Sequence, residues 1–136
     1  MNPVVRNILA VLAGFVFGSI VNMGLIIGGG HLIASPSGAE PPTMESLRAT
    51  MHLFEPKHFL FPFLAHALGT LAGATVAALI GASHQFKLAM GIGALFLAGG
   101  IANCVLLPAP MWFMAVDVLG AYIPMAWIGW KLGSRK

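Results

Sequence analysis

The chain carries very little charge. Only 8% of its 136 residues are Asp, Glu, Lys or Arg, whereas a soluble domain has about 25%. This is too little charge to cover a water-facing surface, so the composition excludes an ordinary soluble domain. The net charge of +3 comes from scattered basic residues, and no basic stripe interleaves with aromatics. We therefore expect no nucleic-acid partner.

Cysteine is nearly absent as well. Cys104 is the single cysteine and lies inside an apolar run. One thiol excludes an intrachain disulfide, a CxxC redox pair and a thiolate zinc site, and we interpret Cys104 as a small packing residue. A single histidine within a span supplies one protein ligand to a haem, so a haem would require a dimer. No cofactor is predicted.

Apolar residues make up 58% of the chain and gather into four long runs. A helix needs about 20 apolar residues to cross the hydrocarbon layer. The first run exceeds the roughly 7–15 residues of a signal-peptide core and no clear A-x-A site follows it, so we interpret it as a retained span. We predict one integral membrane domain over residues 1–136. Its spans are expected at about 3–28, 57–82, 86–107 and 111–131.

Residues 29–56 form the long polar connection between the first two spans. Thr43 is a candidate helix cap, and apolar residues follow it at helical spacing until Pro56 ends the pattern. This pattern predicts a short amphipathic helix in the membrane interface. The helix would either form a lid over the bundle or merely seal the loop against the headgroups.

Short second and third connections predict an all-α, up-down-up-down bundle of four transmembrane helices. Five of the seven basic residues then fall on the side of the termini. By the positive-inside rule both termini are cytoplasmic. In a bacterium the chain would lie in the inner membrane, with the amphipathic helix on the periplasmic face. The five are Arg6, Lys87, Lys131, Arg135 and Lys136, against Arg48 and Lys57 on the other side.

Two stretches of the chain carry a resemblance. NILAVLAGFVFGSIVNMGLI near the start and MESLRATMHLFEPKHFLFPFLAHALGTLAGA in the middle resemble small four-transmembrane-helix bacterial membrane proteins, and the likeness covers the whole chain. The resemblance implies this fold and a bacterial membrane location. It carries no known activity, cofactor or catalytic residue.

Each predicted span contains one polar group at a similar depth, roughly 7–12 Å below the outer boundary. An ionised Asp117 would disfavour insertion by about 2.5–3.5 kcal/mol, so it stays protonated or meets a donor. His66 is the nearest candidate by depth, and Thr70 lies on the same helical side as His66. We predict a buried polar network, which is either purely structural or a proton- or cation-responsive site. Its members are Asn22, His66, Thr70, Asn103 and Asp117.

Small residues mark the helix faces that we expect to pack closely. Gly14 and Gly18 form one step, Gly69 and Gly73 a second, and Gly100 lies on the third span. On the fourth span, Pro124 frees the carbonyl of Gly120 one turn below Asp117. These faces predict contact with a neighbouring helix, with another copy of the chain or with a larger membrane partner.

His52, Glu55 and His58 are the weak candidates for a metal site. Pro56 interrupts the helix between them, so the i, i+4 spacing of zinc-binding histidines is absent. We interpret them as solvated surface residues and predict no metal.

Three functional hypotheses follow. The sequence contains no recognisable set of catalytic residues, so a non-enzymatic function is favoured. The first is a non-enzymatic structural or accessory subunit that forms homo-oligomers or joins a larger complex in the lipid bilayer. The second is a small proton- or cation-responsive transporter or channel that uses His66 and Asp117. The third is a membrane enzyme acting on a lipid or quinone.

Overall fold

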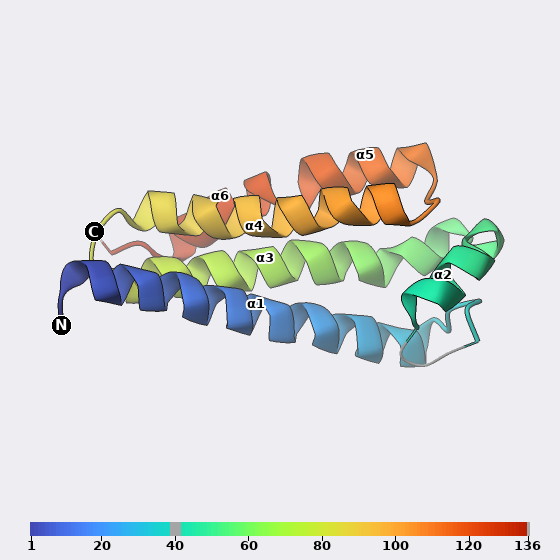
Figure 1. Ribbon diagram of the computed structural model, residues 1–136, viewed down its shortest axis with the longest axis horizontal. Helices are drawn as coiled ribbons and strands as arrows, with labels where there is room; N and C mark the ends of the chain where they lie inside the picture. Colours follow the sequence, from blue (N-terminus) through green and yellow to red (C-terminus); the bar gives the residue numbers. More distant parts are fainter. Residues whose placement is uncertain (39–41, 136) are drawn as a thin grey trace.

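The structure, a computed structural model, describes residues 1–38 and 42–135. Within this range all regular structure is helical (Figure 1). The helices are α1 (Pro3–Leu32), α2 (Met44–Thr50), η1 (Met51–Leu53), η2 (Pro56–Phe59), α3 (Leu60–Ile80), α4 (Gln85–Leu106), α5 (Met111–Gly120) and α6 (Ile123–Gly133).

Four helical stretches are long and apolar enough to cross a membrane. They are Pro3–Leu32, Pro56–Ile80, Gln85–Leu106 and Met111–Gly133. The predicted all-α class and the four apolar helices are thus confirmed. By length and composition, this is a multi-pass membrane protein.

Two helix boundaries differ from the prediction. The first helix does not end at residue 28 but continues to Leu32, and its 30 residues give a length of about 45 Å. The fourth span is not one helix, because it breaks between Gly120 and Ile123 into α5 and α6. Residues 39–41 of the expected loop, and Lys136 of the charge count, lie outside the described residues.

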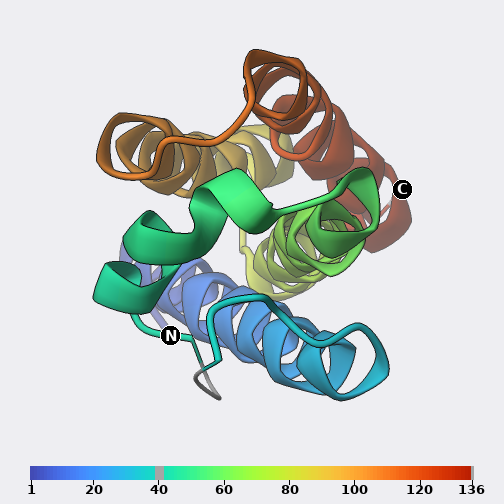
Figure 2. The same ribbon diagram turned by 90° about the vertical axis from the view of Figure 1, so that its right-hand side faces the viewer.

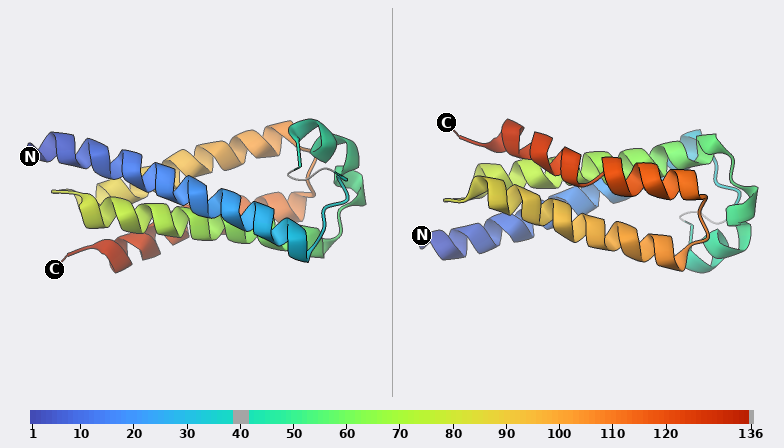
Figure 3. Two further views of the ribbon diagram at one scale, coloured as in Figure 1. Left: turned by 90° about the horizontal axis from the view of Figure 1, so that it is seen from below. Right: turned by 90° about the horizontal axis from the view of Figure 1, so that it is seen from above.

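Both chain termini lie at one end of the molecule, which we call the terminal end (Figures 1 and 3). The short helix α2 lies across the opposite end, here called the α2 end (Figure 2). Thr43 caps α2 as expected, since its hydroxyl accepts the backbone N–H of Ser46 at 3.1 Å. Beyond Pro56, the chain enters α3, which packs against α1, α4 and α6.

Glycines allow α1 and α3 to approach backbone to backbone. A Cβ built on Gly14 would lie 2.5 Å from the carbonyl oxygen of Gly73, and one on Gly18 would lie 2.6 Å from that of Gly69. No larger residue fits at these crossings. The two predicted glycine steps therefore pack against each other inside the chain.

Side-chain size divides the bundle along its length. Toward the terminal end, six core side chains from α3, α4 and α6 are fully buried and all but one are alanine, so these helices pack closely. In this terminal half, α6 packs tightly against α3 and α4. Toward the α2 end, the fourth span continues as α5, which makes few contacts with α3 and α4. The break in the fourth span therefore separates a closely packed half from a wider one. The six are Ala74, Ala77, Ala78, Ala89, Ile92 and Ala126.

Polar side chains close the terminal end by binding the last carbonyls of α3. Arg6 donates to the carbonyl of Ile80 at 2.6 Å, and Arg135 donates to that of Leu79 at 3.1 Å. The Asn7 amide oxygen accepts the N–H of Ala82 at 2.8 Å. The two arginines satisfy carbonyls that a helix end leaves unpaired and place positive charge at its negative pole.

Replacing Gly14 by Ala tests the glycine crossing. Because the added methyl would overlap the Gly73 backbone, we expect the free energy of unfolding in detergent to fall by about 1–3 kcal/mol. Gly24→Ala is the matched control on the same helix, since nothing lies within 4 Å of its added Cβ. It should be neutral or stabilising by up to about 1 kcal/mol. Equal effects of the two changes would contradict the close crossing.

Candidate functional site

The centre of the site is a pair of ionisable side chains from two helices. His66 on α3 and Asp117 on α5 meet with Nδ1 and Oδ1 2.8 Å apart. Asp117 is 3% exposed, so its carboxyl is removed from solvent. Because a buried carboxyl requires hydrogen-bond partners, this contact satisfies one of its oxygens.

Tyr122 satisfies the other carboxyl oxygen. Its hydroxyl donates to Asp117 Oδ2 at 2.9 Å, and its ring stacks on the His66 imidazole with centroids 5.8 Å apart. The phenol occupies a notch at Gly100, where an added Cβ would overlap the Tyr122 hydroxyl and ring. Gly100 thus packs against the Tyr122 side chain, whereas the sequence predicted that it would pack against another helix.

Three other predicted members lie near the pair without joining it. The hydroxyl of Thr70 is fully buried and donates to the His66 carbonyl of its own helix at 2.8 Å. Asn22 packs against Gly69, and Asn103 lies on α4 at the edge of a cavity. Among the described residues, neither amide is bonded to Asp117, whose two oxygens are taken by His66 and Tyr122.

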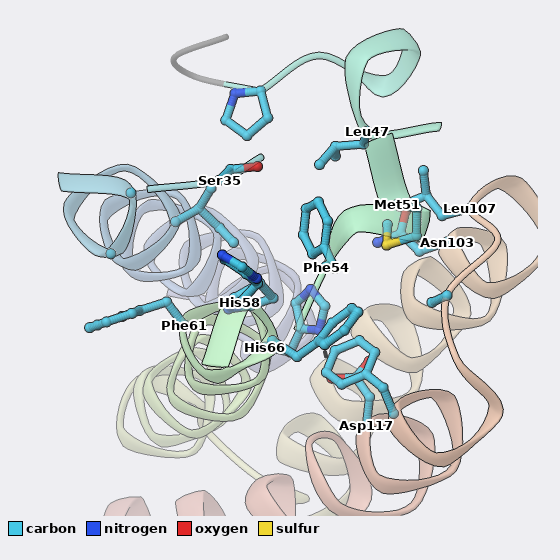
Figure 4. A pocket seen from close by; sticks show the side chains of 18 of the residues that line it. Ser35, Leu47, Met51, Phe54, His58, Phe61, His66, Asn103, Leu107 and Asp117 are labelled. Atoms are coloured by element: carbon cyan, nitrogen blue, oxygen red, sulfur yellow. Dashed lines mark hydrogen bonds and ion pairs between the residues drawn. The ribbon is translucent and has the colours of Figure 1, made fainter. Parts of the chain in front are cut away.

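A cavity of about 440 Å³ extends from the α2 end to the His66–Asp117 pair (Figure 4). Its volume is that of a site for a small organic molecule. α1, α3, α4 and α5 contribute to its wall, and α2 and η1 contribute at the α2 end. Its described lining includes four phenylalanines and three methionines: Phe54, Phe59, Phe61, Phe113, Met44, Met51 and Met114.

Of the three weak metal candidates, His58 and Glu55 interact with neighbouring residues, and His52 is exposed. His58 Nδ1 accepts the backbone N–H of Glu55 at 2.8 Å, and the Glu55 carboxylate lies 3.7 Å from the Lys57 ammonium. His52 is exposed on η1. In the part of the chain that is described, no three His, Cys, Asp or Glu side chains are grouped as metal ligands would be.

No protein family model, curated protein or solved structure matches this chain. The geometry of the His66–Asp117 pair and of its cavity is therefore what points to a function.

Sequence reasoning missed Tyr122. In an unbroken helix a residue five positions after Asp117 would lie about 140° around the axis from it, away from the carboxyl. The break at Ala121 and Tyr122 removes this restriction and turns the phenol toward Asp117. Pro124, which lies in the first turn of α6, was the sequence signal that could have indicated this helix break.

Gly100→Ala tests the notch that holds Tyr122. Since the added methyl overlaps the phenol, we expect Tyr122 to move away from Asp117 and stability to fall by about 1–3 kcal/mol. Tyr122 is the only tyrosine in the sequence, so 3-fluorotyrosine labelling gives a single fluorine NMR resonance that reports this movement.

Gly99→Ala is the matched control for this experiment, because nothing lies within 4 Å of a Cβ at Gly99. Its fluorine resonance should stay at the wild-type position. An unmoved resonance in Gly100→Ala would show that the notch does not hold the ring.

Proposed function

We propose that this chain is a non-enzymatic membrane protein that binds a small lipophilic molecule between its helices. The observation that carries the proposal is the cavity of about 440 Å³ that reaches the buried His66–Asp117 pair. A mainly apolar cavity with a few convergent polar groups is the usual form of a small-molecule site. The apolar wall would supply affinity, and the pair would orient the ligand.

Binding fits this geometry better than passage of a proton or cation. On the terminal side of the pair the helices meet in fully buried alanines and Ile92, whose side chains offer no hydrogen-bonding atom. Ions and protons cross a bilayer along polar or water-filled paths. The pair therefore faces one end of the bundle, which suits a binding site.

An accessory role remains compatible with ligand binding, but the glycine steps no longer support oligomer formation. Gly14, Gly18, Gly69 and Gly73 pack inside the chain, so a second copy would have to use other faces. An enzyme acting on a lipid or quinone would need a reacting group beside the ligand. Cys104 lines the same cavity, but no hydrogen bond among the described residues links its thiol to His66.

We infer an up-down-up-down arrangement across a bacterial inner membrane, with both termini cytoplasmic and α2 as an interfacial lid on the periplasmic side. The support is threefold. The termini share one end of the molecule and α2 crosses the other (Figures 1 and 2). Lys131 packs over the Trp130 ring at 4.5 Å near the terminal end, as interfacial anchors do. Met44, Leu47 and Met51 line the cavity from α2 and η1.

Cysteine accessibility tests the orientation. In a Cys104→Ser background, His52→Cys is expected to react with a membrane-impermeant maleimide on spheroplasts of an expressing bacterium, because the exposed His52 would face the periplasm. Ser134→Cys should react only after the membrane is opened. The reverse pattern would invert the proposed topology.

The lone thiol also tests ligand binding in the unmodified protein. Cys104 lines the cavity, so a bound lipophilic molecule should shield it. In detergent-solubilised wild type, we expect diphenylmethane at about ten times its Kd to slow alkylation of Cys104 by N-ethylmaleimide about tenfold.

Two tryptophan variants provide the comparison. Ala109→Trp fills part of the cavity wall and should abolish protection by diphenylmethane. Ala98→Trp adds the same ring on an exposed face of α4 and should leave protection intact. Protection that is absent in the wild type, or equal in the two variants, would refute binding in this cavity.

A further inference from the structure

The orientation of His66 determines which of its atoms a ligand would meet. Nδ1 is engaged by Asp117, and one face of the ring lies on Tyr122. Nε2, on the far edge of the ring, has no hydrogen-bond partner among the described residues. Since no buried side-chain nitrogen or oxygen of those residues lacks a partner, Nε2 is accessible rather than enclosed. His66 lines the cavity (Figure 4), so Nε2 is its free polar atom there.

Charge balance determines whether Nε2 carries a proton. If the pair holds one shared proton, it is either a carboxylate with an imidazolium or a carboxylic acid with an imidazole. Nε2 bears hydrogen in both forms, because in the second Nδ1 accepts from the acid. Only a pair that has lost this proton leaves Nε2 as an acceptor, and that pair carries a net negative charge.

Among the residues that the structure describes, none supplies a fixed counterion for a net negative charge at this place. Asp117 is 3% exposed, and an uncompensated charge in an apolar interior is costly. The described cation that lines the cavity, Lys57, is exposed and lies beside Glu55. Arg48 donates to the carbonyl of Leu106 at 2.8 Å. The apolar surroundings therefore disfavour the form of the pair with a net negative charge, and they favour the forms in which His66 Nε2 bears hydrogen.

A second histidine offers the same kind of group. His58 also lines the cavity, and its Nδ1 accepts the Glu55 backbone N–H at 2.8 Å. A neutral His58 thus carries its proton on Nε2. Asp117 is the one carboxylate among the described lining residues, and both of its oxygens are already engaged in hydrogen bonds.

We propose that the cavity selects lipophilic molecules that carry an acceptor oxygen, specifically carbonyl compounds, and that His66 Nε2–H donates to that oxygen. This inference rests on the proposed function and names the chemical class of its ligand. The phenylalanines and methionines around the cavity suit an aromatic ring, since rings pack favourably on other rings and on thioethers. An aryl ketone combines both features.

Benzophenone and diphenylmethane form a matched pair of probes, because they differ at one position, a carbonyl against a methylene. With protection of Cys104 as the readout, we expect wild type to bind benzophenone about tenfold more tightly than diphenylmethane. Equal binding of the two would refute the donor role of His66 while leaving the cavity as a binding site. Protection by neither probe would refute the proposed function itself.

Two substitutions of His66 separate its two nitrogens. The Asn amide nitrogen takes the place of Nδ1, so His66→Asn keeps a partner for Asp117 and should lose the preference for benzophenone. The Gln amide nitrogen takes the place of Nε2, so His66→Gln should keep most of the preference. The opposite ranking would overturn the assignment. If neither variant folds, the infrared carbonyl stretch of benzophenone bound to wild type decides, because a hydrogen bond lowers it and an unshifted band refutes the bond.

Discussion

A carboxyl group in an apolar interior must be given hydrogen-bond partners, and the half of the bundle around Asp117 is arranged to supply them. His66 comes from α3 and Tyr122 from the break between α5 and α6. The phenol fits only because position 100 on α4 is glycine. The two carboxyl oxygens of Asp117 on α5 thus fix the position of α3 through His66, and the Tyr122 phenol that binds one of them packs on α4 at Gly100. Such a network favours one packing over its alternatives, since any shift leaves a buried polar group unpaired.

The sizes of side chains along α3 explain why the rest of the bundle has two different halves. Its terminal half presents Gly69, Gly73 and fully buried alanines, so α1, α4 and α6 approach closely. The preceding residues present Phe59 and Phe61, whose bulk holds the neighbouring helices apart. The break in the fourth span lets α6 follow the narrow half while α5 follows the wide one. The cavity lies in the wider half, where α5 makes few contacts with α3 and α4.

Local sequence signals predicted the helices well because each signal acts within its own segment. Apolar length identified the four spans, and the Thr43 cap marked the start of α2. The pairing of His66 with Asp117 was also accessible, since both lie at one depth and a buried acid needs a donor. Tyr122 was not accessible, because its position depends on a helix break. The same holds for the extent of α1, where Gly29 and Gly30 were assigned to the polar connection but continue the helix.

The closed half of the bundle limits what the pair is able to do. A histidine and an aspartate that share a proton are well suited to relaying protons, but a relay needs a next acceptor. In the described structure the neighbours toward the terminal end are alanines and Ile92, and the hydroxyls of Thr70 and Thr75 donate to carbonyls of their own helix. Nε2 of His66 is thus the polar atom of the pair that faces the cavity. The proposed donor is therefore held in place by the same hydrogen bond that joins α3 to α5.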